Sequence, residues 1–123
     1  MIYIPDSAKS FRTFKNKGVT VLKKNTLGVI GLAARARGIV IGTNQVLEAI
    51  RGRKAKLVLI ASDASDNTKK TLKDKSSYYN ARLEEIDITT DELGRAVGHS
   101  NTASIAFTDF NFVKAYEKSL TSE

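Results

Sequence analysis

The sequence predicts an α/β fold, a three-layer α-β-α sandwich with a central four-stranded mixed sheet. Short apolar segments alternate along the chain with longer segments whose apolar residues recur at helical spacing. The segment 57–61 is apolar at every position, which is typical of a central strand buried on both faces. With 123 residues, 41% of them apolar, the chain can bury one core without a disulfide or a structural metal. Regular alternation of helices and strands favours helices on both faces of the sheet.

Turn and capping residues divide the domain into its elements. Gly38 and Gly52 end two helices, and the pair Thr89 and Glu92 has the spacing of a capping box that opens another. The predicted elements are, in order, a helix capped by Asn25, a strand at 39–41, a helix from Thr43 or Asn44, a strand at 56–61, a helix from Ser65 or Asp66 to Tyr79, a strand at 82–88, a helix at 89–98, a strand at 103–107 and a helix capped by Asp109. We expect one domain over residues 25–123.

Residues 1–24 differ in composition and are predicted to form a basic N-terminal extension that is partly disordered. They contain six basic residues and one acid without a sustained period, although Val19, Val21 and Leu22 are compatible with a short strand. A second basic stretch at 35–56 has six Lys and Arg against Glu48 alone. Because the chain carries a net charge of +7, these stretches favour a polyanionic partner; a solvated basic surface is the alternative.

Several classes of protein are excluded by what the sequence lacks. Without Cys there is no thiolate nucleophile or Cys-based zinc site, and His99 alone cannot form a two-His site, so no metal or cofactor is expected. The glycines at 38 and 42 do not have the spacing of a phosphate-binding loop. Asp63 follows the central strand, where α/β sheets often bind ligands, but a turn or capping role explains it more simply. We therefore expect no enzyme.

The hydropathy pattern also bears on the compartment. No apolar run approaches the ~18 residues of a membrane span, and the first 24 residues lack the apolar centre of a secretory signal. We expect a cytoplasmic protein without membrane association.

The tetrapeptide at residues 42–45 is the most informative polar motif. It places Asn44 and Gln45 on the first turn of a helix whose backbone N–H groups have no helical partners. Amide side chains there can cap the helix, or can pair with purine edges while nearby arginines contact phosphates. The residues alone leave both interpretations open.

Four motifs in order resemble the kink-turn RNA-binding ribosomal protein family named after the archaeal L-seven-Ae protein, with its bacterial YlxQ-like members the most similar. The motifs are Leu27 to Arg37 (LGVIGLAARAR), Gly42 to Gln45 (GTNQ), Ala55 to Ala61 with Asp63-Ala64-Ser65, and Glu92 to Gly98 (ELGRAVG). The resemblance covers about residues 25–113. It implies a non-enzymatic, ribosome- or translation-associated protein that binds a kink-turn or similarly structured RNA.

The resemblance also implies which residues contact the RNA. Residues 42–45 would meet the sheared G·A pairs of a kink-turn, and the loop at 98–102 would cover a flipped-out nucleotide. A sharp kink exposes purine edges that the deep groove of regular A-form RNA hides. The RNA-binding residues that the resemblance implies are Gly42, Thr43, Asn44 and Gln45 at the bases and Gly98, His99 and Ser100 in the loop. Because they are basic and near in sequence, Arg37, Arg51 and Arg53 are expected to contact phosphates.

Three positions depart from the family pattern. Gln45 replaces the usual acid, Glu48 stands where a phosphate-facing Lys is common, and the loop at 99–101 is more polar than usual. Arg51 can offset Glu48 as its i,i+3 partner. An alternative function is therefore a protein-interaction adapter of the same fold that has lost kink-turn recognition. We expect a monomer that binds structured RNA, including ribosomal RNA, with no small-molecule substrate and with protein partners in ribonucleoprotein complexes.

Overall fold

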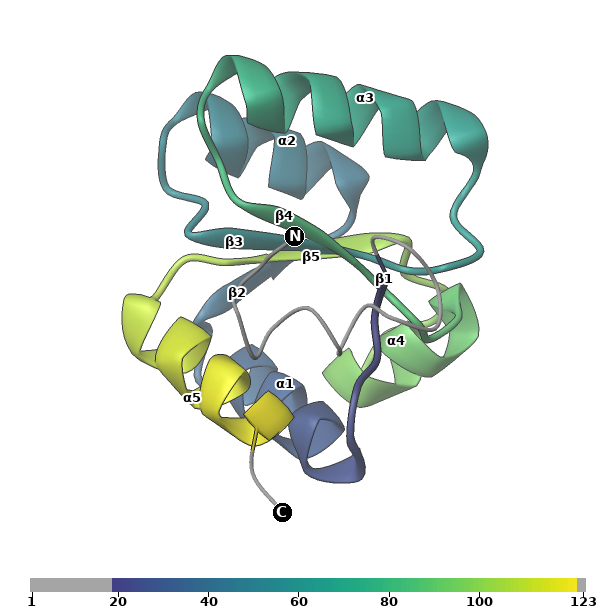
Figure 1. Cartoon of the computed structure of the whole chain (residues 1–123), viewed down its shortest axis with the longest axis vertical. Coiled ribbons are helices and arrows are strands. Elements are labelled where there is room, and N and C mark those ends of the chain that lie inside the picture. The colour runs from purple at the N-terminus through teal and green to yellow at the C-terminus, as the bar shows by residue number, and fades with distance from the viewer. Residues whose placement is uncertain (1–18, 122–123) are drawn as a thin grey trace, which may run out of the picture.

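A computed structural model describes residues 19–121 of the chain (Figure 1). Most of the predicted basic extension, residues 1–18, lies outside the described residues. The elements are β1 (Val19–Thr20), α1 (Lys24–Arg35), β2 (Ile39–Ile41), α2 (Thr43–Arg51), β3 (Leu57–Ile60), α3 (Asp66–Tyr78), β4 (Leu83–Ile86), α4 (Thr90–Val97), β5 (Ser104–Phe107) and α5 (Phe110–Thr121). Every helix and strand that the sequence predicts within residues 25–123 is present.

The sheet is mixed, as predicted, but it has five strands rather than four. Its order is β1-β4-β3-β5-β2, with β1, β4 and β3 parallel and β5 antiparallel to both β3 and β2. The fifth strand, β1, pairs Val19 with Glu85 and lies in the segment that the sequence assigned to the extension. A two-residue strand is too short to show a periodicity, and its partner lies more than sixty residues away in the sequence.

Helices cover both faces of the sheet, which confirms the three-layer α-β-α sandwich. Figure 1 shows α2 and α3 on one face and α1, α4 and α5 on the other. On β3, Val58 and Ile60 pack into the first layer, while Leu57 and Leu59 pack into the second. All four side chains of β3 are fully buried, so the central position predicted for this strand is confirmed.

The capping predictions can be compared bond by bond. Thr89 and Glu92 form the predicted capping box, with the Glu92 N–H donating to Thr89 Oγ1 at 3.1 Å and the Thr89 N–H to Glu92 Oε1 at 2.9 Å. Ser65 Oγ accepts from the Thr68 N–H at 3.1 Å, and Asp109 precedes α5 as predicted. The prediction that Asn25 caps α1 was wrong. The helix begins one residue earlier, at Lys24, after a turn in which the Lys23 N–H donates to a buried threonine, Thr26.

Because β2, β3 and β4 run in the same direction, the sheet has a carboxyl end, where these strands end and β5 begins, and an opposite amino end. Helices α1, α2 and α3 each return to the amino end and stop at a residue with positive φ: Arg37, Arg53 and Asn80, at 60°, 58° and 60°. In all three turns the following N–H donates to the carbonyl five residues back, as when the Lys54 N–H bonds to Ala49 O at 2.8 Å. An L-residue with a side chain pays roughly 1–2 kcal/mol for this left-handed conformation.

Candidate nucleic-acid interface

The first turn of α2 lies at the carboxyl end of the sheet and is held against β5. Gly42, the residue before the helix, has φ +95°, which an L side chain rarely adopts. Its N–H donates to Ser104 O at 3.0 Å, and Thr43 Oγ1 lies 3.4 Å from Ser104 Oγ. Asn44 and Gln45 are exposed, and no side chain caps this helix N-terminus. Residues 42–45 therefore present two amide side chains and first-turn N–H groups to solvent.

The loop after α4 lies beside this turn, because its last residues lead directly into Ser104. Gly98 adopts φ +78° and ends α4, and the His99 N–H donates to Gly94 O at 2.8 Å. Thr102 is buried: its N–H donates to Thr90 O at 3.0 Å, and its hydroxyl donates to Ser100 O at 3.0 Å. The loop is thus fixed by backbone hydrogen bonds at both ends.

Close packing against Gly94 fixes the middle of the same loop. A Cβ at Gly94 would lie only 1.8 Å from the carbonyl oxygen of Ser100, so no other residue fits while the loop keeps this course. The side chains at positions 99, 100 and 101 remain exposed. The structure therefore brings the sequence-predicted residues Gly98, His99 and Ser100 to the same end of the sheet as residues 42–45. The side chains of His99 and Ser100 are exposed there.

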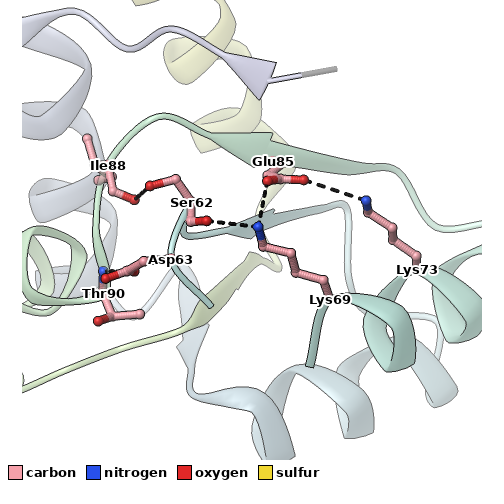
Figure 2. Close-up of polar contacts among 7 residues, drawn as sticks. All are labelled: Ser62, Asp63, Lys69, Lys73, Glu85, Ile88 and Thr90. Carbon is pink, nitrogen blue, oxygen red and sulfur yellow. Dashed lines mark hydrogen bonds and ion pairs between the residues drawn. The ribbon is translucent and has the colours of Figure 1, made fainter. Parts of the chain in front are cut away.

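The turn after β3 is joined to the segment after β4 and to the start of α4, as Figure 2 shows. Asp63 Oδ1 accepts a hydrogen bond from the Thr90 N–H at 2.7 Å, at the start of α4. Ser62 Oγ donates to Ile88 O at 3.1 Å, and the Ala61 N–H donates to Ala103 O at 2.9 Å. Asp63 acts as the capping residue that the simpler sequence interpretation expected.

An ion-pair network beside that turn is also drawn in Figure 2. The ammonium group of Lys69 on α3 donates to Ser62 O at 2.8 Å and to Glu85 Oε2 at 2.9 Å, and Lys73 Nζ lies 3.5 Å from Glu85 Oε1. The side chains of Lys69 and Glu85 are only 20% and 17% exposed. These two lysines are therefore used within the fold, where they share the single negative charge of Glu85.

The three arginines that the sequence assigned to phosphates lie elsewhere. Arg37 precedes β2 and Arg53 precedes β3, so both are at the amino end of the sheet. Arg51 is the last residue of α2, seven residues and roughly 10 Å along the helix axis from Asn44. All three are exposed. The structure does not bring them together with residues 42–45.

Glu48 lies between these two regions, one helical turn after Asn44. It lines a groove between α2 and the edge strand β2. The lining residues of this groove are Val40, Gln45, Glu48, Ala49, Gly52, Lys54 and Thr108. The groove runs from the amide side chain of Gln45 to Lys54 near the amino end, with the carboxylate of Glu48 between them.

The described part of the chain, residues 19–121, contains neither a metal cluster nor a membrane-spanning helix. No group of three or more His, Cys, Asp or Glu side chains is close enough in this range to hold a metal ion. No helix in the same range has the length and apolar character needed to cross a membrane.

The protein is an α/β sandwich, and the loops at the carboxyl end of its sheet are fixed by hydrogen bonds and form a polar surface. The chain belongs to the ribosomal protein L7Ae/L30e/S12e/Gadd45 family, whose model matches residues 24–115. The family resemblance that the four motifs carry in the sequence is thereby confirmed.

Curated relatives and solved structures agree with this assignment. The chain is 40% identical over 84 residues to the RNA-binding protein YlxQ of Bacillus subtilis (strain 168), a match that spans 68% of this chain and 83% of that protein. It is 45% identical over 64 residues to the RNA-binding protein YlxQ of Enterococcus faecium, which spans 52% of this chain and 62% of that protein.

Among solved structures, a Bacillus halodurans protein of unknown function superimposes with a TM-score of 0.73 at 32% identity, over 81% of this chain and 100% of the other. The Giardia lamblia 15.5kD RNA binding protein superimposes with a TM-score of 0.67 at 20% identity, over 86% of this chain and 93% of the other. At that identity the second structure supports the fold alone.

Sequence reasoning missed the residues that hold the surface rather than form it. Thr102 and Ser104 anchor the loop and α2, but a buried Thr and a buried Ser in or beside a strand carry no distinctive pattern. Gly94 lies in a quoted motif, and a glycine inside a predicted helix is a signal of close packing that could have identified its role.

Proposed function

We propose that this chain is an RNA-binding protein that recognises a kink-turn or a similarly bent RNA, in ribosomal or another translation-associated RNA. The observation that carries the proposal is the juxtaposition of residues 42–45 with the clamped loop at 98–102 at one end of the sheet. Membership of the family and its similarity to RNA-binding proteins support RNA as the ligand. The cytoplasmic location stays a prediction from the sequence.

Base recognition is assigned to the amide side chains. Asn44 and Gln45 each offer a donor and an acceptor, the pairing that an amide makes with an adenine edge. The positive φ of Gly42 and the absence of any atom within 4 Å of the place where its Cβ would be leave room for close approach of a base or sugar. The first-turn N–H groups of α2 add donors suited to a phosphate oxygen.

The loop at 98–102 supplies the second half of the surface. Its backbone is fixed by Gly94, Thr90 and Thr102, so it is already in place before RNA binds. In this proposal the exposed side chains of His99 and Ser100 contact a nucleotide turned out of the stack. Such a fixed surface binds the bent form of the RNA more tightly than the straight form and so shifts the RNA toward the bend.

The test is a titration of a kink-turn RNA that carries a fluorophore on each arm, at physiological salt. The control RNA has the same length with Watson–Crick pairs in place of its sheared G·A pairs, so the two RNAs have the same charge. We expect tight binding and closure of the arms with the kink-turn only. Equal, weak and steeply salt-dependent binding to both RNAs would instead favour the adapter that has lost kink-turn recognition.

A further inference from the structure

The amino end of the sheet carries a second basic surface, which we call the amino-end patch: Arg37, Arg51, Arg53, Lys54 and Lys56. All five residues are exposed. Within residues 19–121, none of the five makes an ion pair, whereas Lys69, Lys73, Arg82 and Arg95 all do. Other exposed bases such as Lys114 and Lys118 also make no ion pair, so what distinguishes the patch is that five such bases gather at one end of the sheet.

The register of the sheet brings the members of the patch together from two separate loops. Ile39 and Leu57 both lie opposite Phe107, on either side of β5. The two strands are therefore about 10 Å apart where they begin, at ~4.8 Å between neighbouring strands. Arg37 stands two residues before Ile39, and Lys56 donates its N–H to Phe107 O at 2.7 Å. The loops before β2 and β3 thus carry the basic residues of the patch to the same end of the sheet.

Two of these arginines occupy positions where a glycine would be less strained. Arg37 and Arg53 have φ of 60° and 58°, and each stands next to a glycine that does not take that conformation. The same turn after α3 uses Asn80, a residue that tolerates positive φ. Retaining arginine at two strained positions at the same end of the molecule is a cost that a function of the guanidinium groups would explain.

Few acids oppose this surface. Asp109 follows β5 at the same end, but its Oδ1 accepts from the Asn111 N–H at 2.9 Å. Glu117 is paired with Arg82 at 2.6 Å. Glu48 lies in the groove between the two surfaces, and its carboxylate repels phosphate groups from that middle section. The amino-end patch is therefore suited to bind anionic groups on the side of Glu48 that is away from residues 42–45.

We propose that the amino-end patch is a second, phosphate-binding surface that contacts a duplex stem flanking the kinked core of the RNA. This inference rests on the proposed function. The distance from Gly42 to Arg37 along β2 is roughly 16 Å, at ~3.3 Å per residue. A duplex that leaves the kinked core in this direction reaches the patch after about six base pairs, at the ~2.8 Å rise per pair of A-form RNA. The RNA partner must then have a stem at least that long.

The experiment combines two RNAs with two matched variants of the full chain. Both RNAs have the same kinked core; the flanking stems end after about three base pairs in one and after about ten in the other, on either side of the predicted reach. The patch variant is Arg37→Asn with Arg53→Asn, because asparagine removes the charge and still tolerates positive φ. The control variant is Lys114→Gln with Lys118→Gln, two exposed lysines of α5 that do not belong to the patch.

We expect the patch variant to bind the long-stem RNA more weakly, with a slope of log affinity against log salt that is smaller by about 2. It should bind the short-stem RNA as the wild type does, and the control variant should be unchanged with both. An equal loss on both RNAs, or no loss on either, would overturn the second surface. Failure of the wild type to distinguish kinked from unkinked RNA would overturn the proposed function instead.

Discussion

Asp63 Oδ1 accepts the backbone N–H of Thr90 at 2.7 Å, across 27 positions of sequence. The same residue, Thr90, accepts from the Thr102 N–H through its carbonyl oxygen at 3.0 Å. Three segments of the carboxyl end, the turn after β3, the start of α4 and the loop before β5, are thus connected through one residue. The position of the candidate RNA-binding loop therefore depends on a carboxylate that does not belong to that loop.

Replacing this carboxylate should loosen the loop. Asp63→Ala leaves the Thr90 N–H without its acceptor and should destabilise the protein by about 1 kcal/mol, the usual cost of losing a helix cap. Asp63→Asn keeps an acceptor oxygen and should lose less. Urea unfolding measures both changes, and hydrogen exchange at the Thr102 N–H reports the loop directly. If the two variants were equally stable, the hydrogen bond would not be the source of the effect.

Gly94 should tolerate no side chain. The Cβ of Gly94→Ala would lie 1.8 Å from the Ser100 carbonyl oxygen, so the loop must move, at a cost of about 1–3 kcal/mol for an overpacked site. Gly31→Ala is the graded control, since its Cβ would lie 3.1 Å from Ala96 O and needs a smaller adjustment. We expect a larger loss of both stability and kink-turn affinity at position 94. Similar losses at both positions would show that the loop is not held by this contact.

Local chemistry let the sequence predict most of the fold. The capping box of Thr89 and Glu92, the cap at Ser65 and the buried strand at 57–60 each depend on neighbouring residues, and each is found in the structure. Strand β1 was not recognised as part of the sheet, because Val19 is placed by its pairing with Glu85. The start of α1 was misplaced because the chain enters that helix directly from the turn after β1.

The site was predictable in its residues but not in its layout. The motif at 42–45 and the glycine at 98 could be identified from the sequence, and the topology brings them to one end of the sheet. Arg37 and Arg53 were grouped with them because they are near in sequence. In the structure β2 and α2 each span the sheet and carry those arginines to the other end. Residues on either side of a strand or helix lie at its opposite ends whatever the strand direction, so nearness in sequence was a misleading guide here.

Two other glycines should respond to alanine with opposite signs. Gly28 lies inside α1 with nothing within 4 Å of its Cβ position, so Gly28→Ala should stabilise the protein by roughly 0.5–1 kcal/mol through helix propensity. Gly98 has φ +78°, so Gly98→Ala should destabilise it by about 1–2 kcal/mol. Thermal or urea unfolding of the two variants gives both signs. A destabilising Gly28→Ala would contradict the open space beside α1.

Asn44 provides the most direct test of base recognition, because its side chain is exposed and does not cap α2. Asn44→Ala should cost on the order of 1–3 kcal/mol of binding to kink-turn RNA, the scale of one bidentate base contact. It should leave the weak binding of unkinked RNA unchanged, since that binding depends on charge. Asn67→Ala, at an exposed position of α3, is the matched control and should alter neither. Equal losses on the two RNAs would mean that Asn44 does not read the bases of the kinked form.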